Sequence, residues 1–252
     1  MEALAKIGNV HLNVSLDGFR PESHGRFRGD ESSFVKTIET IRHLSRYQLL
    51  QGLLVTPNNF AKISEYAEIC KFAIQNKATY VLINPLSSMG RGIKVQKILR
   101  TSDEAMRQIG KITFPFSSHI QLVYIRFPNK QKLPLGFCEA ENIIYVFVSG
   151  EITICPYLVF AAKTPQSLHK PKEFIVGNIF KDADIMAKLD AYKFQERYHL
   201  EDNLTCKNCS LNSQCGKGCP AAIIASGQRI KEGRDQLCPK SNSFKGGKNE
   251  KN

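Results

Sequence analysis

The chain has 252 residues, 42% of them hydrophobic, and its 35 basic side chains outnumber 23 acidic ones to give a formal net charge of +12. A chain of this length and composition buries one or two cores without disulfide staples, which excludes a small secreted scaffold held by cross-links. The N-terminus has no basic stretch followed by an apolar one, and no run approaches the roughly 18 apolar residues of a membrane span, so we expect a soluble, cytoplasmic protein without a membrane partner.

The first half of the chain alternates expected strands with expected helices. The strands, over residues 10–17, 49–55 and 80–83, show either apolar-polar alternation or a nearly continuous apolar run. Helices are expected after the N-cap residues at 30–33 and over residues 61–76, where apolar side chains recur at helical spacing. This order predicts parallel strands joined by right-handed crossovers, which is an α/β fold.

Polar side chains mark one face of the first expected strand. Asn13, Ser15 and Asp17 alternate with apolar residues up to Gly18. If the apolar face packs on the helices, the polar face lines the inside of a curved sheet, where parallel α/β proteins hold ligands. Asp17 and Gly18 are equally typical of a simple turn, so a ligand contact and a turn remain as alternatives. Three strands are too few to close a barrel, and we therefore expect that barrel strands upstream of residue 10 are missing.

The second half of the chain has a less regular order of expected helices and strands. A helix is expected over residues 95–109, a strand over 120–125, and a helix over 184–195. Strands over 143–148 and 152–154 flank Ser149-Gly150-Glu151, which is a tight hairpin signal because glycine accepts a positive φ. The stretch over 205–220 is rich in loop residues and supplies four thiols.

Seven of the eight cysteines form one ordered array. Their spacing is C-x11-G-x4-C, then C-x2-C-x5-C-x3-C, and then a last cysteine after 18 residues: Cys138, Cys155, Cys206, Cys209, Cys215, Cys219 and Cys238. In a reducing cytosol a cluster of this kind indicates metal ligation or catalysis. We expect thiolates that bind a soft metal and a protein that is sensitive to oxygen.

These residues resemble the SPASM domain of radical S-adenosylmethionine (radical SAM) enzymes that modify peptides. The motifs that carry the resemblance are the seven-cysteine array, Gly177-Asn178-Ile179, Pro220 and Asp235-x2-Cys238. The stretch from Val14 to Gly18, with His24 and Arg28-Gly29 after it, is similar to the fourth strand and following loop of the radical SAM barrel. The resemblance implies a partial (β/α)6 barrel with strands 4 to 6 over residues 1–126, a SPASM domain with a β-hairpin over 127–240, and a disordered basic tail over 241–252.

For metal, the resemblance implies two auxiliary [4Fe-4S] clusters. The outer cluster would be held by Cys206, Cys209, Cys215 and Cys238, and the inner one by Cys138, Cys155 and Cys219. The inner set has three members because residues 131–136 lack the further cysteine that several relatives carry. We hypothesise an open iron on the inner cluster, available to a substrate thiolate or another donor. Cys70 is the one spare thiol, and its place on an apolar helical face predicts a core residue.

The resemblance also implies S-adenosylmethionine, contacted by Ser15, Asp17 and Arg28, a peptide or protein substrate, and an electron donor such as flavodoxin or ferredoxin. The chain has no C-x3-C-x2-C loop and no Gly-Gly-Glu segment of the barrel. We therefore expect an N-terminally truncated form of such an enzyme: a truncated gene model, a split enzyme with a complementary N-terminal fragment, or a degenerate copy. It would bind the cofactor only if the missing N-terminal half is present, and it would generate no radical alone. Pro156 stands where sulfatase-maturing relatives carry an aspartate base, which favours cross-linking of a ribosomally made peptide over formylglycine formation.

Two other classes remain open. The Cys206-x2-Cys209 pair and the positive charge also suit a zinc-binding nucleic-acid module. Tetrahedral zinc would use four of the seven thiolates and leave three unused. A solvated basic surface explains the positive charge more simply than a nucleic-acid binding surface does. A non-catalytic iron-sulfur partner, which binds a peptide or relays electrons for another subunit, fits the cysteine array as well as an enzyme does.

Overall fold

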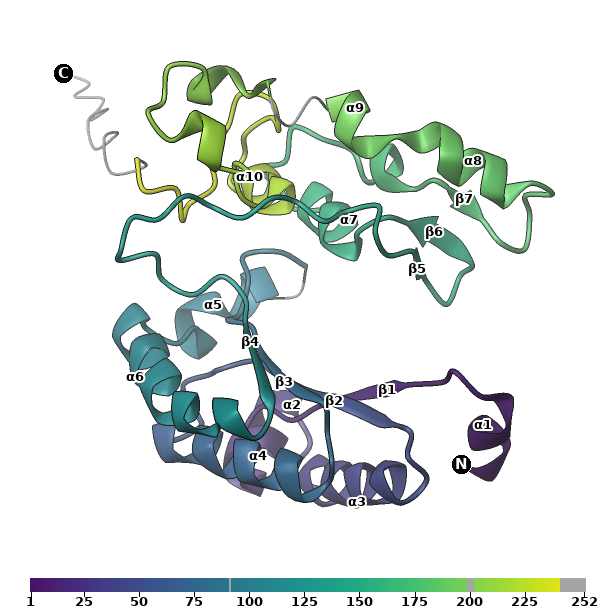
Figure 1. Ribbon diagram of the computed structural model, residues 1–252, viewed down its shortest axis with the longest axis vertical. Coiled ribbons are helices and arrows are strands. Elements are labelled where there is room, and N and C mark those ends of the chain that lie inside the picture. The colour runs from purple at the N-terminus through teal and green to yellow at the C-terminus, as the bar shows by residue number, and fades with distance from the viewer. Residues whose placement is uncertain (91, 199–201, 241–252) are drawn as a thin grey trace. The chain divides into compact units, whose positions relative to one another are not determined.

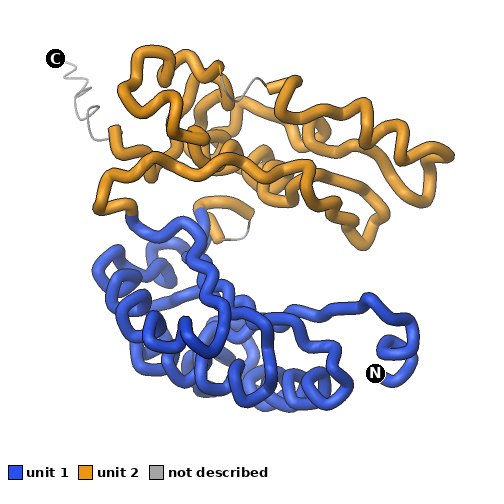
Figure 2. The backbone as a smooth tube through the Cα atoms, viewed as in Figure 1, with its two compact units in different colours: residues 1–87, 94–128 blue, residues 88–93, 129–252 orange. Residues whose placement is uncertain are grey.

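The computed structural model describes residues 1–90, 92–198 and 202–240, so the tail expected over 241–252 lies outside the described residues. The chain divides into two compact units, each with a hydrophobic core of its own (Figure 2). The first unit contains residues 1–87 and 94–128, and the second contains residues 88–93 and those from 129 onward.

The first unit is built on a parallel sheet of four strands in the order β1-β2-β3-β4 (Figure 1). The strands are β1 (Leu12–Ser15), β2 (Leu50–Val55), β3 (Tyr80–Ile83) and β4 (Gln121–Tyr124). Each lies within a predicted strand, and the parallel pairing confirms the expected α/β fold. Residues 16 and 17, which follow β1, therefore lie at the carboxyl edge of the sheet, together with the ends of the other strands.

Two long helices of the first unit, over residues 33–46 and 63–75, pack against the sheet. In chain order the helical elements are α1 (Glu2–Ile7), the π-helix η1 (Pro21–Gly25), α2 (Arg26–Arg28), α3 (Ser33–Arg46), α4 (Ile63–Gln75), α5 (Gly92–Leu99), α6 (Asp103–Thr113) and the 3-10 helix η2 (Phe114–Ser118). The buried stripe of α3 consists of Ile38, Ile41 and Leu44, spaced as one face of a helix requires. Cys70 on α4 is completely buried, as predicted for a core residue.

The prediction of a single helix over residues 95–109 is wrong in one respect, because the structure has two helices there. The break falls at residues 100–102, where Arg100 forms an isolated β-bridge with Asn58. Ser102 then begins α6 as its N-cap, with its hydroxyl accepting a hydrogen bond from the Ala105 amide at 3.1 Å. A serine N-cap inside an apolar periodic stretch is the local signal for this break.

The second unit contains a small antiparallel sheet in the order β5-β6-β7. Its strands are β5 (Tyr145–Val146), β6 (Glu151–Thr153) and β7 (Gly177–Asn178). Gly150 turns the predicted hairpin with a φ of 82°, and a Cβ there would lie 2.3 Å from the Phe180 ring, so the turn requires glycine. β5 is shorter than the strand expected over 143–148, β6 begins one residue before the strand expected over 152–154, and β7 is an addition that the periodicity does not indicate.

Short helices complete the second unit. They are α7 (Pro156–Ala162), η3 (Pro171–Phe174), α8 (Ile185–Tyr192), α9 (Phe194–Tyr198), η5 (Leu204–Cys206), η6 (Asn212–Gln214) and α10 (Pro220–Ala225). The predicted helix over 184–195 is divided into α8 and α9 at Lys193, whose φ is 42°. Helices α7 and α10 pack on each other and, with Phe174 and Phe194, form the core of this unit. Among the described helices none is long and apolar enough to cross a bilayer.

Candidate functional site

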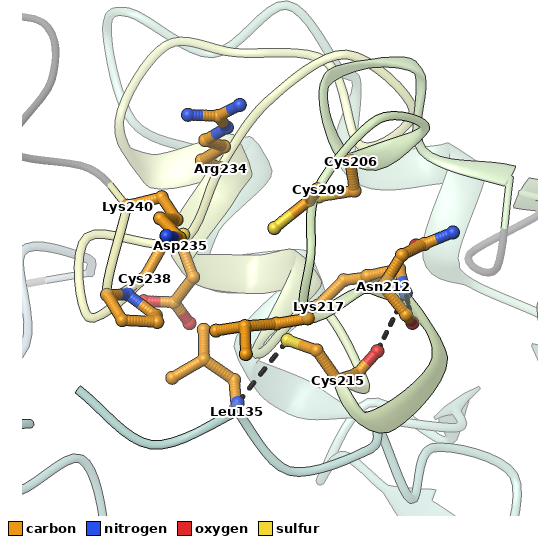
Figure 3. Close-up of a pocket in the computed structure, with 12 residues that line it drawn as sticks. Leu135, Cys206, Cys209, Asn212, Cys215, Lys217, Arg234, Asp235, Cys238 and Lys240 are labelled. Atoms are coloured by element: carbon orange, nitrogen blue, oxygen red, sulfur yellow. Dashed lines mark hydrogen bonds between the residues drawn. The ribbon is translucent and has the colours of Figure 1, made fainter. Parts of the chain in front are cut away.

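Four cysteines surround one pocket in the second unit (Figure 3). They are the four of the predicted outer set: Cys206, Cys209, Cys215 and Cys238. The first three come from the loop that contains η5 and η6, and the fourth comes from a turn near the end of the described chain. The structure thus brings together thiols that lie up to 32 positions apart in the sequence.

Asn203 folds the start of the cysteine loop. Its amide nitrogen donates to the carbonyl oxygens of Ile230 (3.1 Å) and Gly233 (2.7 Å), and its Oδ1 accepts from the Thr205 amide (3.0 Å). Asn203 is 3% exposed, so these bonds satisfy a buried polar group while they attach the loop to the segment that leads to Cys238. The sequence analysis missed Asn203, since nothing local distinguishes it from an ordinary turn residue.

Lys217 closes the C-x3-C part of the loop. Its ammonium donates to the carbonyl oxygens of Asn212 (2.6 Å) and Cys215 (2.8 Å), and its own φ is 63°. Lys217 and Arg234 both line the pocket, so cationic side chains accompany the four sulfurs. The Leu135 amide also donates to Cys215 Sγ at 3.3 Å, a contact of the kind that tunes a thiolate ligand.

The thiols of this pocket influence one another electrostatically. Burial raises the pKa of the Cys238 thiol, the neighbouring Cys206 and Cys215 raise it further, and Arg234 opposes them. A bound cation reverses this penalty, because a metal stabilises several thiolates at once. The pocket is therefore suited to a positively charged metal core held by thiolates.

The three cysteines of the predicted inner set lie against the core of the second unit. Cys138, Cys155 and Cys219 are each partly buried there. Burial raises the pKa of the Cys138 thiol to about 11, and Cys219 and Cys155 raise it further, as neighbouring thiolates do. Burial likewise raises the pKa of Cys155, with Cys219 adding to the rise. These mutual effects indicate that the three thiols are close enough to influence one another.

A repeated Cys-Pro pair explains why two of these cysteines lie in the same region. Cys155 is the N-cap of α7 with Pro156 at the first helical position, and Cys219 is the N-cap of α10 with Pro220 in the same place. Since α7 and α10 pack on each other, their caps bring the two cysteines into the same region. The repeat is visible in the sequence and is the signal from which this pairing could have been inferred.

The donor set fits iron-sulfur clusters. All eight cysteines are free thiols, and seven of them fall into one group of four and one group of three. Within the described chain no three His, Cys, Asp or Glu side chains converge closely enough to hold a single metal ion. The ligands of a [4Fe-4S] cluster surround a cube, with one thiolate for each iron, so they do not converge on one point.

The residues predicted to contact S-adenosylmethionine lie at the carboxyl end of β1 in the first unit. Asp17 is completely buried, and its Oδ2 accepts from Arg28 Nε at 2.7 Å while Oδ1 accepts from the Thr56 amide at 2.8 Å. Burial raises the pKa of the Asp17 carboxyl, and Arg28 and Thr56 act against that rise. Asp17 thus closes a loop and orients Arg28, whose side chain stays 40% exposed. Ser15 is partly buried, and in the described part of the chain its hydroxyl makes no hydrogen bond.

Glu65 is a second loop anchor that the sequence analysis missed. Its Oε2 accepts from the Phe19 amide (2.6 Å) and from Ser23 Oγ (2.5 Å), and its Oε1 accepts from the Lys62 amide (2.8 Å). The residue is 4% exposed and caps α4 while it holds the loop after β1. A buried glutamate with three donors stiffens the segment that carries Arg28.

Comparisons with known proteins give two sequence relatives and a structural relative of this chain. No protein-family model matches the chain. It is 27% identical over 112 residues to the sporulation killing factor maturation protein SkfB of Bacillus subtilis (strain 168), and 23% identical over 176 residues to the antilisterial bacteriocin subtilosin biosynthesis protein AlbA of the same organism. The structure of SuiB from Streptococcus suis with bound S-adenosylmethionine superposes with a TM-score of 0.60 at 16% identity.

The resemblance to radical SAM enzymes with a SPASM domain is confirmed. The structural likeness covers 94% of this chain and 56% of SuiB, and it confirms the predicted α/β fold class. The two sequence matches cover 43% and 69% of this chain but 26% of SkfB and 36% of AlbA. The chain thus spans about half the length of the solved radical SAM structure and less of the curated relatives.

His24 makes the radical SAM-like first unit sensitive to acid. Its side chain is 2% exposed, and its Nδ1 accepts from the Asp17 amide at 3.1 Å. Burial, followed by the charge of Arg28, lowers the pKa of His24 to about 4. Between pH 6.5 and 4 the unfolded chain therefore takes up a proton that the folded chain does not, so stability falls as the pH drops through this window.

Because of this histidine, we expect the free energy of unfolding of the first unit to fall by about 2 kcal/mol when the pH drops from 7 to 5. Hydrogen-deuterium exchange of the β1 to β3 amides at the two pH values measures the loss, after correction for the intrinsic exchange rate. His24→Gln should remove most of the pH dependence, whereas His43→Gln, at an exposed position of α3, should leave it unchanged. Equal slopes in all three proteins would contradict this role for His24.

Proposed function

We propose that this chain is part of a radical SAM peptide or protein maturase and that it carries two auxiliary [4Fe-4S] clusters. The observation that carries the proposal is the grouping of seven cysteines into four around one pocket and three against the core of the second unit. The names of SkfB and AlbA, a maturation protein and a bacteriocin biosynthesis protein, support a peptide substrate. The structure of SuiB bound to its precursor peptide SuiA supports it too.

In this proposal the outer cluster is held by Cys206, Cys209, Cys215 and Cys238, and the inner cluster by Cys138, Cys155 and Cys219, with one iron open. The bound clusters would supply redox-active iron that accepts an electron or a substrate donor. The chain's own part is to hold the thiolates, to shield the inner set with α7 and α10, and to place Lys217 and Arg234 beside the outer set. Residues 127–240 would form this SPASM domain, and residues 1–126 the barrel part.

Radical chemistry requires a C-x3-C-x2-C loop, and we propose that a complementary fragment supplies it, with flavodoxin or ferredoxin as the electron donor. Ser15, Asp17 and Arg28 are the proposed contacts of S-adenosylmethionine. A reducing cytosol would keep the cysteines available for iron. A second candidate function is a non-catalytic iron-sulfur partner that binds a peptide or relays electrons for another subunit, since the same seven cysteines would serve it.

Anaerobic purification followed by iron and acid-labile sulfide analysis tests the proposal. We expect a brown protein with about eight irons per chain, and Mössbauer spectra in which one of two clusters has an incompletely thiolate-ligated iron. A compact, colourless and iron-free protein would overturn the proposal. Stoichiometric zinc in that protein would establish the zinc-binding alternative.

Ser15→Ala tests the proposed cofactor contact. In an assembly that contains the C-x3-C-x2-C loop, we expect this variant to bind S-adenosylmethionine about 5- to 10-fold more weakly, because one hydrogen bond contributes about 1 kcal/mol. Isothermal titration calorimetry measures the affinity, and an unchanged melting temperature shows that the fold is retained. Unchanged affinity would remove Ser15 from the site.

A further inference from the structure

A buried carboxylate connects the two groups of cysteines. Asp235 is 2% exposed and lines the pocket of the outer set (Figure 3). Its Oδ2 accepts a hydrogen bond from the amide of Cys219, a member of the inner set, at 2.8 Å. The same residue lies three positions before Cys238, a member of the outer set. One side chain is thus in contact with a proposed ligand of one cluster and close in sequence to a ligand of the other.

On the outer side, Asp235 builds the turn that carries Cys238. Its Oδ1 accepts from the Leu237 amide at 2.9 Å, and its backbone carbonyl accepts from the Cys238 amide at 2.9 Å. The first of these bonds is an Asx turn, in which an aspartate or asparagine side chain replaces a backbone turn contact. The direction of the Cys238 side chain therefore depends on Asp235.

On the inner side, the chain is shaped to let this carboxylate approach. Gly218 precedes Cys219 with a φ of 81°, and a Cβ at Gly218 would lie 2.6 Å from Asp235 Oδ2. Only glycine combines this conformation with this approach. The Asp235 carboxylate then fixes the backbone of Cys219 at the point where α10 begins.

We propose that Asp235 is a positioning residue that serves both clusters, through a separate contact for each. Its Oδ2 fixes the Cys219 backbone for the inner cluster, and its Oδ1 and carbonyl fix the turn of Cys238 for the outer cluster. This inference rests on the proposed function, since it concerns the same two ligand sets. It assigns a separate effect on each cluster to Asp235, which is not itself a ligand.

Asp235→Asn separates the two contacts. The asparagine Oδ1 still accepts from the Leu237 amide, because asparagine forms Asx turns as readily as aspartate does. Its amide group then faces the Cys219 N–H, so that one donor meets another and the bond is lost. We expect this variant to keep the outer cluster and to lose the inner one, with iron falling from about eight to about four per chain.

Three further variants test this interpretation. Asp235→Ala removes both side-chain contacts and should reduce both clusters. Asp190→Ala removes the same charge from an exposed position of α8 and should leave both clusters intact. Gly218→Ala, which places a methyl group against the same carboxylate oxygen, should reproduce the selective loss of the inner cluster without changing an acid.

The readouts are iron content and low-temperature EPR of the reduced proteins after anaerobic reconstitution. Cys209→Ala and Cys155→Ala provide reference spectra for chains that lack the outer or the inner cluster. Loss of only the inner signal in Asp235→Asn supports the proposal. Retention of both signals, an equal loss of both, or an insoluble Asp235→Asn chain would overturn it, while a wild-type chain without clusters would overturn the proposed function itself.

Discussion

Replacing Cys209 with alanine is expected to remove about four irons per chain and to leave about four in place. Cys209 lines the pocket of the outer set, and the inner set lies against the core formed by α7 and α10. Three thiolates remain for the outer cluster, but two of them come from a loop whose described helices are single turns, so we expect this cluster to become labile. The inner ligands pack against a hydrophobic core and are not touched by this change. Iron analysis and EPR after anaerobic reconstitution measure the outcome.

Cys155→Ala is the reciprocal experiment and should leave the outer cluster alone. Cys70→Ala is the matched control. Cys70 is the one cysteine outside the array and is completely buried in α4, where burial raises its pKa to about 12. Its replacement should leave iron unchanged and lower the stability of the first unit by about 1 kcal/mol through a small cavity. Iron loss in Cys70→Ala, or full iron in Cys209→Ala, would contradict the ligand assignment.

Removing iron is expected to unfold the cysteine loops of the second unit while the first unit stays folded. The loop over residues 203–219 contains only the single-turn helices η5 and η6 among its described elements. Contacts such as those of Asn203 and Lys217 hold it, and they bury little apolar surface. Metal binding energy then becomes folding energy for this segment, as it does in other small metal-binding domains.

Hydrogen-deuterium exchange before and after anaerobic chelation measures this effect. We expect amide protection over residues 203–219 and around Cys238 to fall at least about 100-fold, since a metal-coupled segment loses several kcal/mol. Amides of β2 and β3 should not change, because the first unit has its own core. Helices α7 and α10 provide an internal comparison, since their apolar packing should preserve part of their protection. Unchanged exchange in the loop would show that the thiols are not structural metal ligands.

Several local features of this protein are determined by the sequence alone. Apolar periodicity indicates the helices and parallel strands of the first unit, and Gly150 indicates the hairpin, because these signals depend on neighbours within a few residues. The spacing of the cysteines likewise predicts a thiolate site. Where local signals are weaker, the prediction is wrong in detail: the Ser102 cap divides one expected helix, and β7 is added by pairing with β6.

Only the tertiary structure decides which of these groups meet. The packing of α7 on α10 brings Cys155 near Cys219, and a distant carboxylate, that of Asp235, holds the Cys219 backbone. It also gives the carboxylate of Asp17 two partners from distant parts of the chain, Arg28 and the Thr56 amide. Spacing along a chain constrains local conformation, whereas contacts between distant residues are selected by burial of apolar faces and by pairing of buried polar groups.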